Sequence, residues 1–487
     1  MRTLAFVLAL LVPLTAAAQI TFERTYGGAS SDLGRSVAQT PDGGYIVAGT
    51  TRSYGAGQSD LWLIKTDAWG STSWSTTFGG PQTDGGRSVA LTLDGGYIIA
   101  GNTTSFGEGQ TDIYLVRTDA DGHTVWTRPY GGPQTETGRS VAPTLDGGFV
   151  VTGYTESYGA ELSDVVLIKV DANGDTVWTR TYGGSSYDSG ESVAQTLDEG
   201  YIVAGGTTTF GAGSWDIYVI KTDSLGDTMW TRTYGGPNYE GGFSVAQTSD
   251  GGYIIVGETE SYGAGDRDVY LVKTDGVGDT IWTRTYGGPY ADGGYSVAQT
   301  NDGGYIITGY GEPFPTGIED LYLIRTDSAG DTLWTRAYAG LAWDGGYSVA
   351  QTLDGGYIVV GYTWPPGDVE DDVYLIKTDA DGMVGVSEGE DELPAVAQYL
   401  AQNRPNPFGS STTICYSLSA GTPVKVAVYD IRGALVRTLA QETVPAGFHS
   451  VVWDGRDQRG RKVASGIYFC RLETGEFTDT KRMALLR

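Results

Sequence analysis

Seven residues that recur at intervals of 52 positions are the clearest candidates for binding chemistry in this sequence. They are Arg35, Arg87, Arg139, Glu191, Phe243, Tyr295 and Tyr347. The set changes from cationic to aromatic along the chain, although the residues around it repeat closely. If the seven positions meet in space, they predict a site with one cationic and one aromatic side. Drift among duplicated copies is the alternative explanation.

Further aromatic residues lie in two kinds of predicted loop. The loops that join the repeats contain Tyr187, Tyr239, Tyr290 and Trp343, and loops within the repeats contain Tyr54, Phe106, Tyr158, Phe210, Tyr262, Phe314 and Trp364. Aromatic rings and carboxylates around a concave face suit stacking on sugar rings or capture of a peptide. We therefore predict that one face of the repeat array binds a glycan or a protein.

Two acidic positions recur in every copy near these loops. One comprises Asp32, Asp84, Glu136, Asp188, Glu240, Asp292 and Asp344, and the other comprises Asp60, Asp112, Asp164, Asp216, Asp268, Asp320 and Asp372. Clustered carboxylates can bind Ca²⁺, but an acid that every copy repeats suits a role in stabilising its own loop. We expect the structural role, and Ca²⁺ stays open as the one candidate metal.

The sequence shows no asymmetric group of residues that indicates catalysis. Its two histidines, His123 and His449, have no Ser or Cys partner in a motif, and no Gly-rich phosphate loop joins a strand to a helix. We expect no cofactor and no catalysis. Acidic residues are abundant, so an extracellular hydrolase or lyase that acts on polysaccharides remains the alternative function.

The body of the chain is a 52-residue repeat in seven copies. One turn is marked by Asp42, Asp94, Asp146, Asp198, Asp250, Asp302 and Asp354, and one strand by Trp74, Trp126, Trp178, Trp230, Trp282 and Trp334. In the fourth copy, apolar runs between Asp-Gly-type turns predict strands over residues 192–196, 201–205, 216–221 and 228–234. Four strands in each of seven copies predict an all-β, seven-bladed β-propeller. The first strand has the smallest residues and suits the crowded axis, and the Trp strand should lie outermost, against the neighbouring blade.

The two ends of the array predict a closed ring. Residues 21–26 have the pattern of a fourth strand, whereas the last copy loses its pattern after Asp379 and has Val386 in place of Trp. The N-terminal strand can therefore complete the last blade, which removes the exposed edges of an open array. An open β-solenoid with capping segments is the alternative architecture.

The turn between the third and fourth predicted strands runs, in the fourth copy, Thr222-Asp223-Ser224-Leu225-Gly226-Asp227-Thr228-Met229-Trp230. It resembles the Asp-box hairpin of sialidase-type propellers, although its spacings differ from the Ser/Thr-x-Asp-x-Gly-x-x-Trp motif of that hairpin. The resemblance implies an architecture and no activity. We expect the Asp to accept hydrogen bonds from the backbone of its own turn.

A second domain is predicted over residues 398–487. Its marker segments are 403–408, 412–418, 426–433, 449–455, 460–469 and 481–487. In this order they resemble the type A C-terminal sorting domain of the bacterial type IX secretion system, and also the immunoglobulin-like domain of flagellar hook-capping proteins. Alternation at Ile414, Tyr416 and Leu418 independently predicts a β-sandwich. The resemblance implies export across the outer membrane, through a terminal signal that we assign to Lys481, Met483, Leu485 and Leu486.

The chain has two cysteines, Cys415 and Cys470, both in this second domain. An oxidising compartment allows a disulfide between them. The sequence does not give the geometry that such a bond requires, so the disulfide stays open at this point.

The first 18 residues have the pattern of a secretory signal peptide. Arg2 precedes an apolar run over residues 4–14, and Ala16–Ala18 offer a cleavage site. The predicted organisation is then a propeller over residues 19–382, an acidic flexible linker over 383–397 and the sorting domain. No later apolar run is long enough to cross a membrane. We expect a protein that is secreted or held at the outer-membrane surface.

Charge is divided unevenly between the two predicted domains. Residues 398–487 contain 12 Lys and Arg against 7 Asp and Glu, a net charge of +5. Because the net charge of the whole chain is −28, residues 1–397 carry a net charge of −33. An acidic body repels nucleic acid and anionic membranes. The expected partners are a glycan or surface protein and the outer-membrane secretion machinery, and a purely structural envelope protein is the third hypothesis.

Overall fold

The computed structural model describes residues 20–311, 319–338, 343–364, 370–384, 399–400, 403, 408, 411–418, 421–444, 447–475 and 477–485. Within these ranges the protein consists of strands and turns, without a helix. The predicted signal peptide and nearly all of the predicted linker lie outside the described residues.

Within the described residues, the first 28 strands form seven four-stranded antiparallel sheets, which we call blades 1 to 7 in chain order. The first strands are β2 (Asp32–Gln39), β6 (Asp84–Leu91), β10 (Glu136–Pro143), β14 (Asp188–Gln195), β18 (Glu240–Gln247), β22 (Gly293–Gln299) and β26 (Asp344–Gln351). The second strands are β3 (Tyr45–Thr51), β7 (Tyr97–Thr103), β11 (Phe149–Thr155), β15 (Tyr201–Thr207), β19 (Tyr253–Thr259), β23 (Tyr305–Gly311) and β27 (Tyr357–Thr363). The third strands are β4 (Asp60–Thr66), β8 (Asp112–Thr118), β12 (Asp164–Val170), β16 (Asp216–Thr222), β20 (Asp268–Thr274), β24 (Asp320–Thr326) and β28 (Asp372–Thr378). The fourth strands are β5 (Thr72–Phe78), β9 (Thr124–Tyr130), β13 (Thr176–Tyr182), β17 (Thr228–Tyr234), β21 (Thr280–Tyr286), β25 (Thr332–Tyr338) and, in blade 7, β1 (Phe22–Tyr26).

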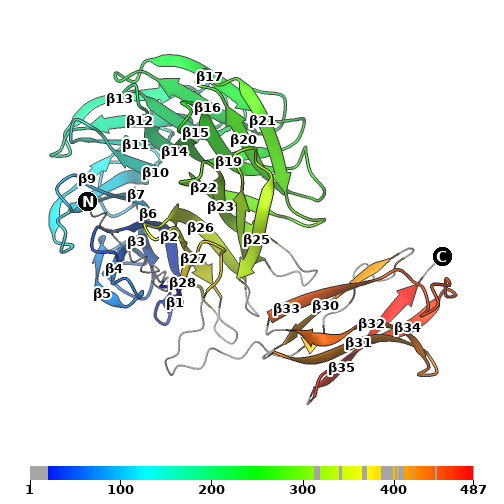
Figure 1. Cartoon of the computed structure of the whole chain (residues 1–487). Coiled ribbons are helices and arrows are strands. Elements are labelled where there is room, and N and C mark those ends of the chain that lie inside the picture. Colours follow the sequence, from blue (N-terminus) through cyan, green and yellow to red (C-terminus); the bar gives the residue numbers. More distant parts are fainter. Residues whose placement is uncertain are drawn as a thin grey trace, which may run out of the picture.

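The blades are arranged around a common centre, with the first strands innermost (Figure 1). Each first strand contacts the first strand of the next blade, and β26 contacts β2. At every junction the amide of a Val donates to the hydroxyl of a Ser in the preceding blade, over 3.1–3.4 Å. Blade 1 and blade 7 are joined in this way by Val37 and Ser348. The prediction of a closed seven-bladed propeller is confirmed.

The hydrophobic core lies between the blades rather than within them. In the second and third strands, residues on both faces are buried, as in β15 and β16. The cluster that contains Ile202 and Ile217 of blade 4 also contains Tyr253 and Val272 of blade 5. Each blade therefore needs a neighbour on both sides to cover its apolar surface.

The N-terminal strand supplies the side chain that closes the last junction. β1 pairs antiparallel with β28, and Phe22 takes the place that Trp has in six other blades. Those Trp rings pack edge-on or tilted against an aromatic of the next blade, as Trp178 does on Tyr201 at 5.7 Å. Phe22 makes the same contact with Tyr45 at 5.8 Å. Each ring also covers a turn glycine of the next blade, such as Gly226 with φ of 79°, where a side chain would collide with Trp178.

The recurring acidic residues stabilise loops, as the sequence predicts. Asp32 accepts hydrogen bonds from the Gly28 amide (2.9 Å) and the Ser53 hydroxyl (2.7 Å). Asp60 accepts from the amides of residues 56 and 57 at 2.8 and 3.1 Å. In the third-to-fourth strand turn, Asp223 accepts from the amides of residues 225 and 227, both at 2.9 Å. The expected role of the Asp-box-like turn is therefore confirmed.

Buried cations tie the opposite end of each blade together. A Lys or Arg of each third strand forms an ion pair with the Asp of the turn between the first two strands. In blade 5, Lys273 lies 2.9 Å from Asp250. Burial opposes ionisation of Asp250, but hydrogen bonds from Thr248, Lys273 and the Gly252 amide outweigh it and lower its pKa to about 2.

The first strands are longer than the sequence predicts. In blade 4 the prediction is 192–196, whereas β14 spans Asp188–Gln195. A β-bulge between Gly190 and Ser192 interrupts the register, and the strand continues beyond it. Glu191 therefore lies inside the strand, at the bulge, and not before it.

The C-terminal residues form the predicted β-sandwich. One sheet has the order β29 (Tyr399–Leu400), β30 (Thr412–Leu418), β33 (Gly447–Trp453). The other has the order β32 (Leu435–Val444), β31 (Thr422–Asp430), β34 (Gly466–Glu473), β35 (Thr478–Leu485). The core between them includes Ile414, Tyr416 and Trp453.

The disulfide that the sequence left open is not formed. Cys470 is a free thiol in the sandwich core, where burial raises its pKa to about 12. It belongs to β34, whereas Cys415 belongs to β30 of the other sheet, and the side chain of Cys415 lies outside the described residues. The neighbours Ile414 and Tyr416 occupy the core between the sheets.

Replacing Phe22 by Ala should open the junction between blades 7 and 1. The ring is 4 % exposed, so its loss should lower stability by about 3–5 kcal/mol, as for other buried Phe residues. The urea midpoint measured by tryptophan fluorescence reports on the propeller, since only Trp453 of the 12 tryptophans lies outside it. The matched control is Val125→Ala, at an exposed site of β9 (58 %). Equal midpoints for the two variants would contradict closure by β1.

Candidate functional site

The β-bulge of each first strand carries one of the seven residues that break the repeat symmetry. The register shifts at the same place in all seven blades, and the extra residues are Arg35, Arg87, Arg139, Glu191, Phe243, Tyr295 and Tyr347. A bulge re-aims one side chain without changing the rest of the strand. Because the first strands surround the centre, the seven bulge positions surround it too (Figure 1).

One side of this ring is aromatic. The Tyr295 ring lies 5.1 Å from Phe243 and 5.3 Å from Tyr347, measured between centroids. Two tyrosines of second strands extend the group, with Tyr310 5.5 Å from Tyr295 and Tyr362 5.4 Å from Tyr347. We call these five residues the aromatic arc. Burial raises the pKa of Tyr295 far above its usual range, so its hydroxyl stays neutral.

The other side of the ring is cationic, and we call Arg35, Arg87 and Arg139 the arginine arc. Arg35 lies over the Tyr347 ring at 4.1 Å and so joins the two arcs. Arg139 lies 3.5 Å from Glu191. Burial raises the pKa of Glu191, although Arg139 and Arg87 oppose the change. Burial, together with the charges of Arg35 and Arg139, lowers the pKa of Arg87 to about 10.

A pocket opens beside the aromatic arc, at the junction of blades 7 and 1. Its volume is about 270 Å³, and we call it the blade-7 pocket; it is lined by Leu33, Trp343, Tyr347, Tyr362, Trp364 and Asp371. The indole rings of Trp343 and Trp364 are 45 % and 41 % exposed. The Trp364 amide donates to the Trp343 carbonyl at 3.1 Å, which fixes the two residues side by side.

Among the described residues that line the pocket, Asp371 is the one carboxylate. Burial and the neighbouring Glu370 raise the pKa of Asp371, and Arg35 opposes the change. The Asp371 carbonyl accepts a 2.6 Å hydrogen bond from the Asp32 amide, which holds this residue at the blade junction. The pocket thus combines flat apolar faces with one hydrogen-bond acceptor.

A second polar network supports the aromatic arc from blade 5. The buried carboxylate of Glu258 accepts hydrogen bonds from Arg267 (3.0 Å) and the Tyr310 hydroxyl (3.0 Å). Arg267 also donates to Glu260 at 2.8 Å and lies over the Tyr239 ring at 5.1 Å. Burial raises the pKa of Glu258. With both oxygens bonded, Glu258 positions Tyr310 and is poorly placed to act as a free general base.

The other predicted loop aromatics have mixed environments. Tyr239 stacks on Trp215, with centroids 6.4 Å apart, whereas Tyr187 is half exposed and Tyr290 is partly buried. The Tyr54 set mostly covers its own blade: Tyr54 packs on Trp62 and donates to the Gly27 carbonyl at 2.7 Å. Phe314 lies outside the described residues. Of this set, only Trp364 lines the blade-7 pocket.

Sequence reasoning overlooked two further positions that lose the repeat symmetry. One is in the second strand, at Thr50, Asn102, Tyr154, Gly206, Glu258, Tyr310 and Tyr362, and the other precedes the third strand, at Ser59, Thr111, Ser163, Trp215, Arg267, Glu319 and Asp371. Leu33 pairs with Thr50 across β2 and β3, close to the bulge. Both positions could have been found in the sequence, because the residue type at each differs between copies, as it does at the bulge position.

Two larger cavities repeat with the blades. The first, of about 720 Å³, lies between blades 2 and 3 and is lined in part by Tyr130, Tyr158 and Thr176. The second, of about 660 Å³, is lined by the equivalent residues Tyr26, Tyr54 and Thr72. Because both occur at the same place in the repeat, we attribute them to blade packing.

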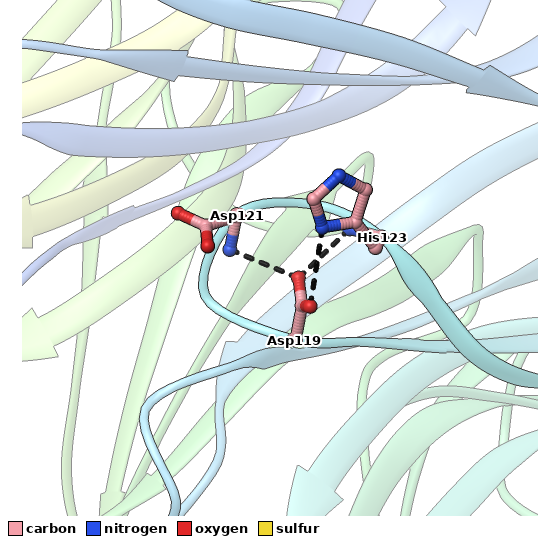
Figure 2. Close-up of side chains that lie close together, drawn as sticks. All are labelled: Asp119, Asp121 and His123. Atoms are coloured by element: carbon pink, nitrogen blue, oxygen red, sulfur yellow. Dashed lines mark hydrogen bonds and ion pairs between the residues drawn. The ribbon is translucent and has the colours of Figure 1, made fainter.

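Among the described residues, one group has ligand atoms close enough to hold a metal ion: Asp119, Asp121 and His123 (Figure 2). Asp119 accepts hydrogen bonds from the amides of Asp121 (3.0 Å) and His123 (2.8 Å), and also lies 3.2 Å from the His123 ring. The same amide bonds occur at Asp171 in the next blade. The geometry thus belongs to the repeated turn, and the exposed His123 is a local addition.

Comparison with known proteins supports the fold. Residues 408–475 match the family of FlgD Ig-like domains, and residues 93–123 match a β-propeller family described as a domain of unknown function, DUF5122. The chain is a β-propeller with a C-terminal Ig-like domain. Regulatory protein FlaEY of Caulobacter vibrioides is 26 % identical over 246 residues, which are 45 % of this chain and 25 % of that protein. The chain thus matches only a quarter of that relative.

Solved structures with similar folds include a component of a secretion system and an enzyme. PorZ, a surface component of the type IX secretion system of Porphyromonas gingivalis, has 13 % identity and a TM-score of 0.33, over 94 % of this chain and 52 % of PorZ. The polysaccharide lyase Uly1 has 10 % identity and a TM-score of 0.46, over 74 % and 100 %. At these values the likenesses carry no inference about function. No helix among the described residues is long and apolar enough to span a membrane.

Proposed function

We propose that this protein is a secreted or surface-held, non-catalytic binding module that captures a saccharide in the blade-7 pocket. The observation that carries the proposal is the pair of exposed indoles, Trp343 and Trp364, beside buried tyrosine rings. Flat aromatic faces suit the apolar faces of sugar rings, and the Asp371 carboxylate can accept hydrogen bonds from sugar hydroxyls. A pocket of about 270 Å³ suits one or two sugar units better than a protein surface.

The geometry near the pocket favours binding over catalysis. A glycoside hydrolase needs two carboxyl groups with different protonation states on either side of the bond that breaks. Among the described residues, one carboxylate lines the blade-7 pocket, and Glu258, in blade 5, is bonded on both oxygens. A hydrolase or lyase remains the competing hypothesis, and it differs from a binding module in making a product.

We further propose that the Ig-like domain directs export, as the resemblance to type IX sorting domains implies. Met483 and Leu485 are fully buried in the sandwich core, so they would act by keeping the domain folded. Lys481 lies at the surface, 3.3 Å from Asp479, and Leu486 lies outside the described residues.

Export can be tested by the location of the protein in a host that has the secretion system. The full chain should reach the medium or the cell surface, whereas a chain without residues 398–487 should stay in the periplasm. The variant Lys481→Ala should reduce export without changing the Tm. It therefore separates recognition by the secretion machinery from folding of the domain. Export of the truncated chain at the level of the full chain would contradict this role.

Substitution of the pocket aromatics should weaken saccharide binding. The full chain would be titrated with a panel of polysaccharides, and each sample would be checked for product. We expect Trp343→Ala and Tyr347→Ala to weaken binding by at least about tenfold, as at other central aromatic anchors. The matched control is Trp69→Ala, because Trp69 is also exposed (60 %) but lies in a third-to-fourth strand turn at the other end of the blade.

The outcomes separate the hypotheses. Binding without product that depends on Trp343 and Tyr347 supports the binding module. A product would favour the hydrolase or lyase. Capture of a surface protein with no bound polysaccharide would favour a protein ligand. No binding to any member of the panel by the folded chain would refute the saccharide proposal.

A further inference from the structure

The arginine arc is the least compensated charged group near the centre of the propeller. Glu191 faces Arg139, Asp371 faces Arg35, and Glu258 is bonded to Arg267. Within the described residues, Arg87 has no carboxylate at ion-pair distance and no hydrogen-bond partner. Arg139 is paired, because its Nε lies 3.5 Å from a Glu191 oxygen, although without hydrogen-bond geometry. Desolvated guanidinium groups are normally paired, so the partly buried Arg87 is unusual.

Arg35 connects Arg87 to the proposed saccharide pocket. Tyr347 lines the pocket and also stacks under Arg35, which in turn interacts electrostatically with Arg87. A sugar ring held against Tyr347 would therefore place its substituents near the arginine arc. Guanidinium groups bind carboxylates and sulfate esters through paired hydrogen bonds, which fixes both the position and the orientation of the anion.

We propose that the ligand is an anionic saccharide, whose ring stacks in the blade-7 pocket and whose carboxylate or sulfate group binds Arg87 and its neighbours in the arginine arc. This inference rests on the proposed function and adds the chemical class of the ligand. The ring of seven bulge residues holds three Arg against one Glu, in a chain whose net charge is −28. Salt screens distant charges over about 8 Å at physiological ionic strength, so the nearby arginines dominate the local interaction.

The arrangement has a second consequence that does not depend on the identity of the saccharide. Without a ligand, the charge of Arg87 is desolvated and repelled by Arg35 and Arg139, which is why its pKa lies near 10. Replacing a poorly compensated, largely desolvated charge by an apolar side chain often stabilises a protein. An arginine kept for binding should therefore reduce the stability of the free protein, whereas a structural arginine should increase it.

Two variants of blade 2 test this point directly. Arg87→Met should raise the Tm of the full chain without ligand. Arg117→Met should lower the Tm, because Arg117 is buried in an ion pair with Asp94 in the same blade. If Arg87→Met lowers the Tm as much as Arg117→Met does, Arg87 has a structural role and the inference is overturned.

The ligand class is tested with matched pairs of saccharides that differ only in charge. We would titrate the full chain with oligogalacturonate and oligomannuronate against their carboxyl-reduced forms, and with a sulfated oligogalactoside against its desulfated form. The acidic members should bind more tightly, and Arg87→Gln should weaken them by roughly tenfold to a hundredfold, the range for a charge-assisted hydrogen bond. The same variant should leave the neutral members unchanged. The uronates and the sulfated sugar distinguish the two anions.

Failure of this inference is distinguishable from failure of the proposed function. If acidic and neutral members bind equally and only Trp343→Ala weakens both, the saccharide pocket stands and the anionic class is wrong. If no member binds to the folded chain, both proposals fall.

Discussion

Each blade of this propeller buries apolar side chains on both faces, and only a neighbouring blade can cover them, so the whole structure depends on closing the ring. Closure uses the same contacts at every junction, above all the Val amide and Ser hydroxyl of the inner strands. Among the described residues, five junctions add a hydrogen bond from a turn amide to a Gln of the next blade. The other two junctions lack a partner for this bond. Between blades 1 and 2, the turn residue is Pro41, which has no amide hydrogen, and Leu91 stands in place of the Gln. Between blades 2 and 3, Pro143 stands in place of the Gln. The ring therefore tolerates the loss of a secondary bond as long as the inner contacts remain.

This constraint also explains where a binding site can arise. Positions that contact the next blade are nearly identical in all copies, because each junction requires the same shape. Three positions in each blade are less constrained by contact with the next blade, because they face the centre or the loop surface. They are the bulge residue, its neighbour in the second strand and the residue before the third strand. In blades 1 to 3 these positions hold arginines at the bulge and mostly small polar residues elsewhere, with Tyr154 as the exception, whereas in blades 6 and 7 all are aromatic or acidic. The aromatic arc and the blade-7 pocket thus occupy the part of the fold that closure leaves free.

Most of the fold could be predicted from the sequence, because the period of 52 residues, the Asp-Gly turns and the displaced fourth strand are local patterns. The polarised ring could be predicted for the same reason, as one position examined across seven copies. The pocket could not, because it depends on Tyr362 in β27 and Asp371 just before β28, which come together only through the pairing of these two strands. The first strands were predicted too short, since a bulge interrupts the pattern that defines a strand. The free Cys470 depends on which sheet each cysteine joins, and spacing along the chain does not determine that.

The central claim is that a uniform ring provides stability and a few asymmetric positions provide binding. Its most direct test gives blade 7 the residues that blade 2 has at four of these positions, through Trp343→Thr, Tyr362→Asn, Trp364→Thr and Asp371→Thr. The measurement is saccharide binding by this variant, with cooperative thermal unfolding as proof that the ring is closed. We predict a folded propeller that no longer binds. A variant that binds as well as the native chain would contradict the assignment of the site, and a variant that cannot fold would contradict the separation of stability from binding.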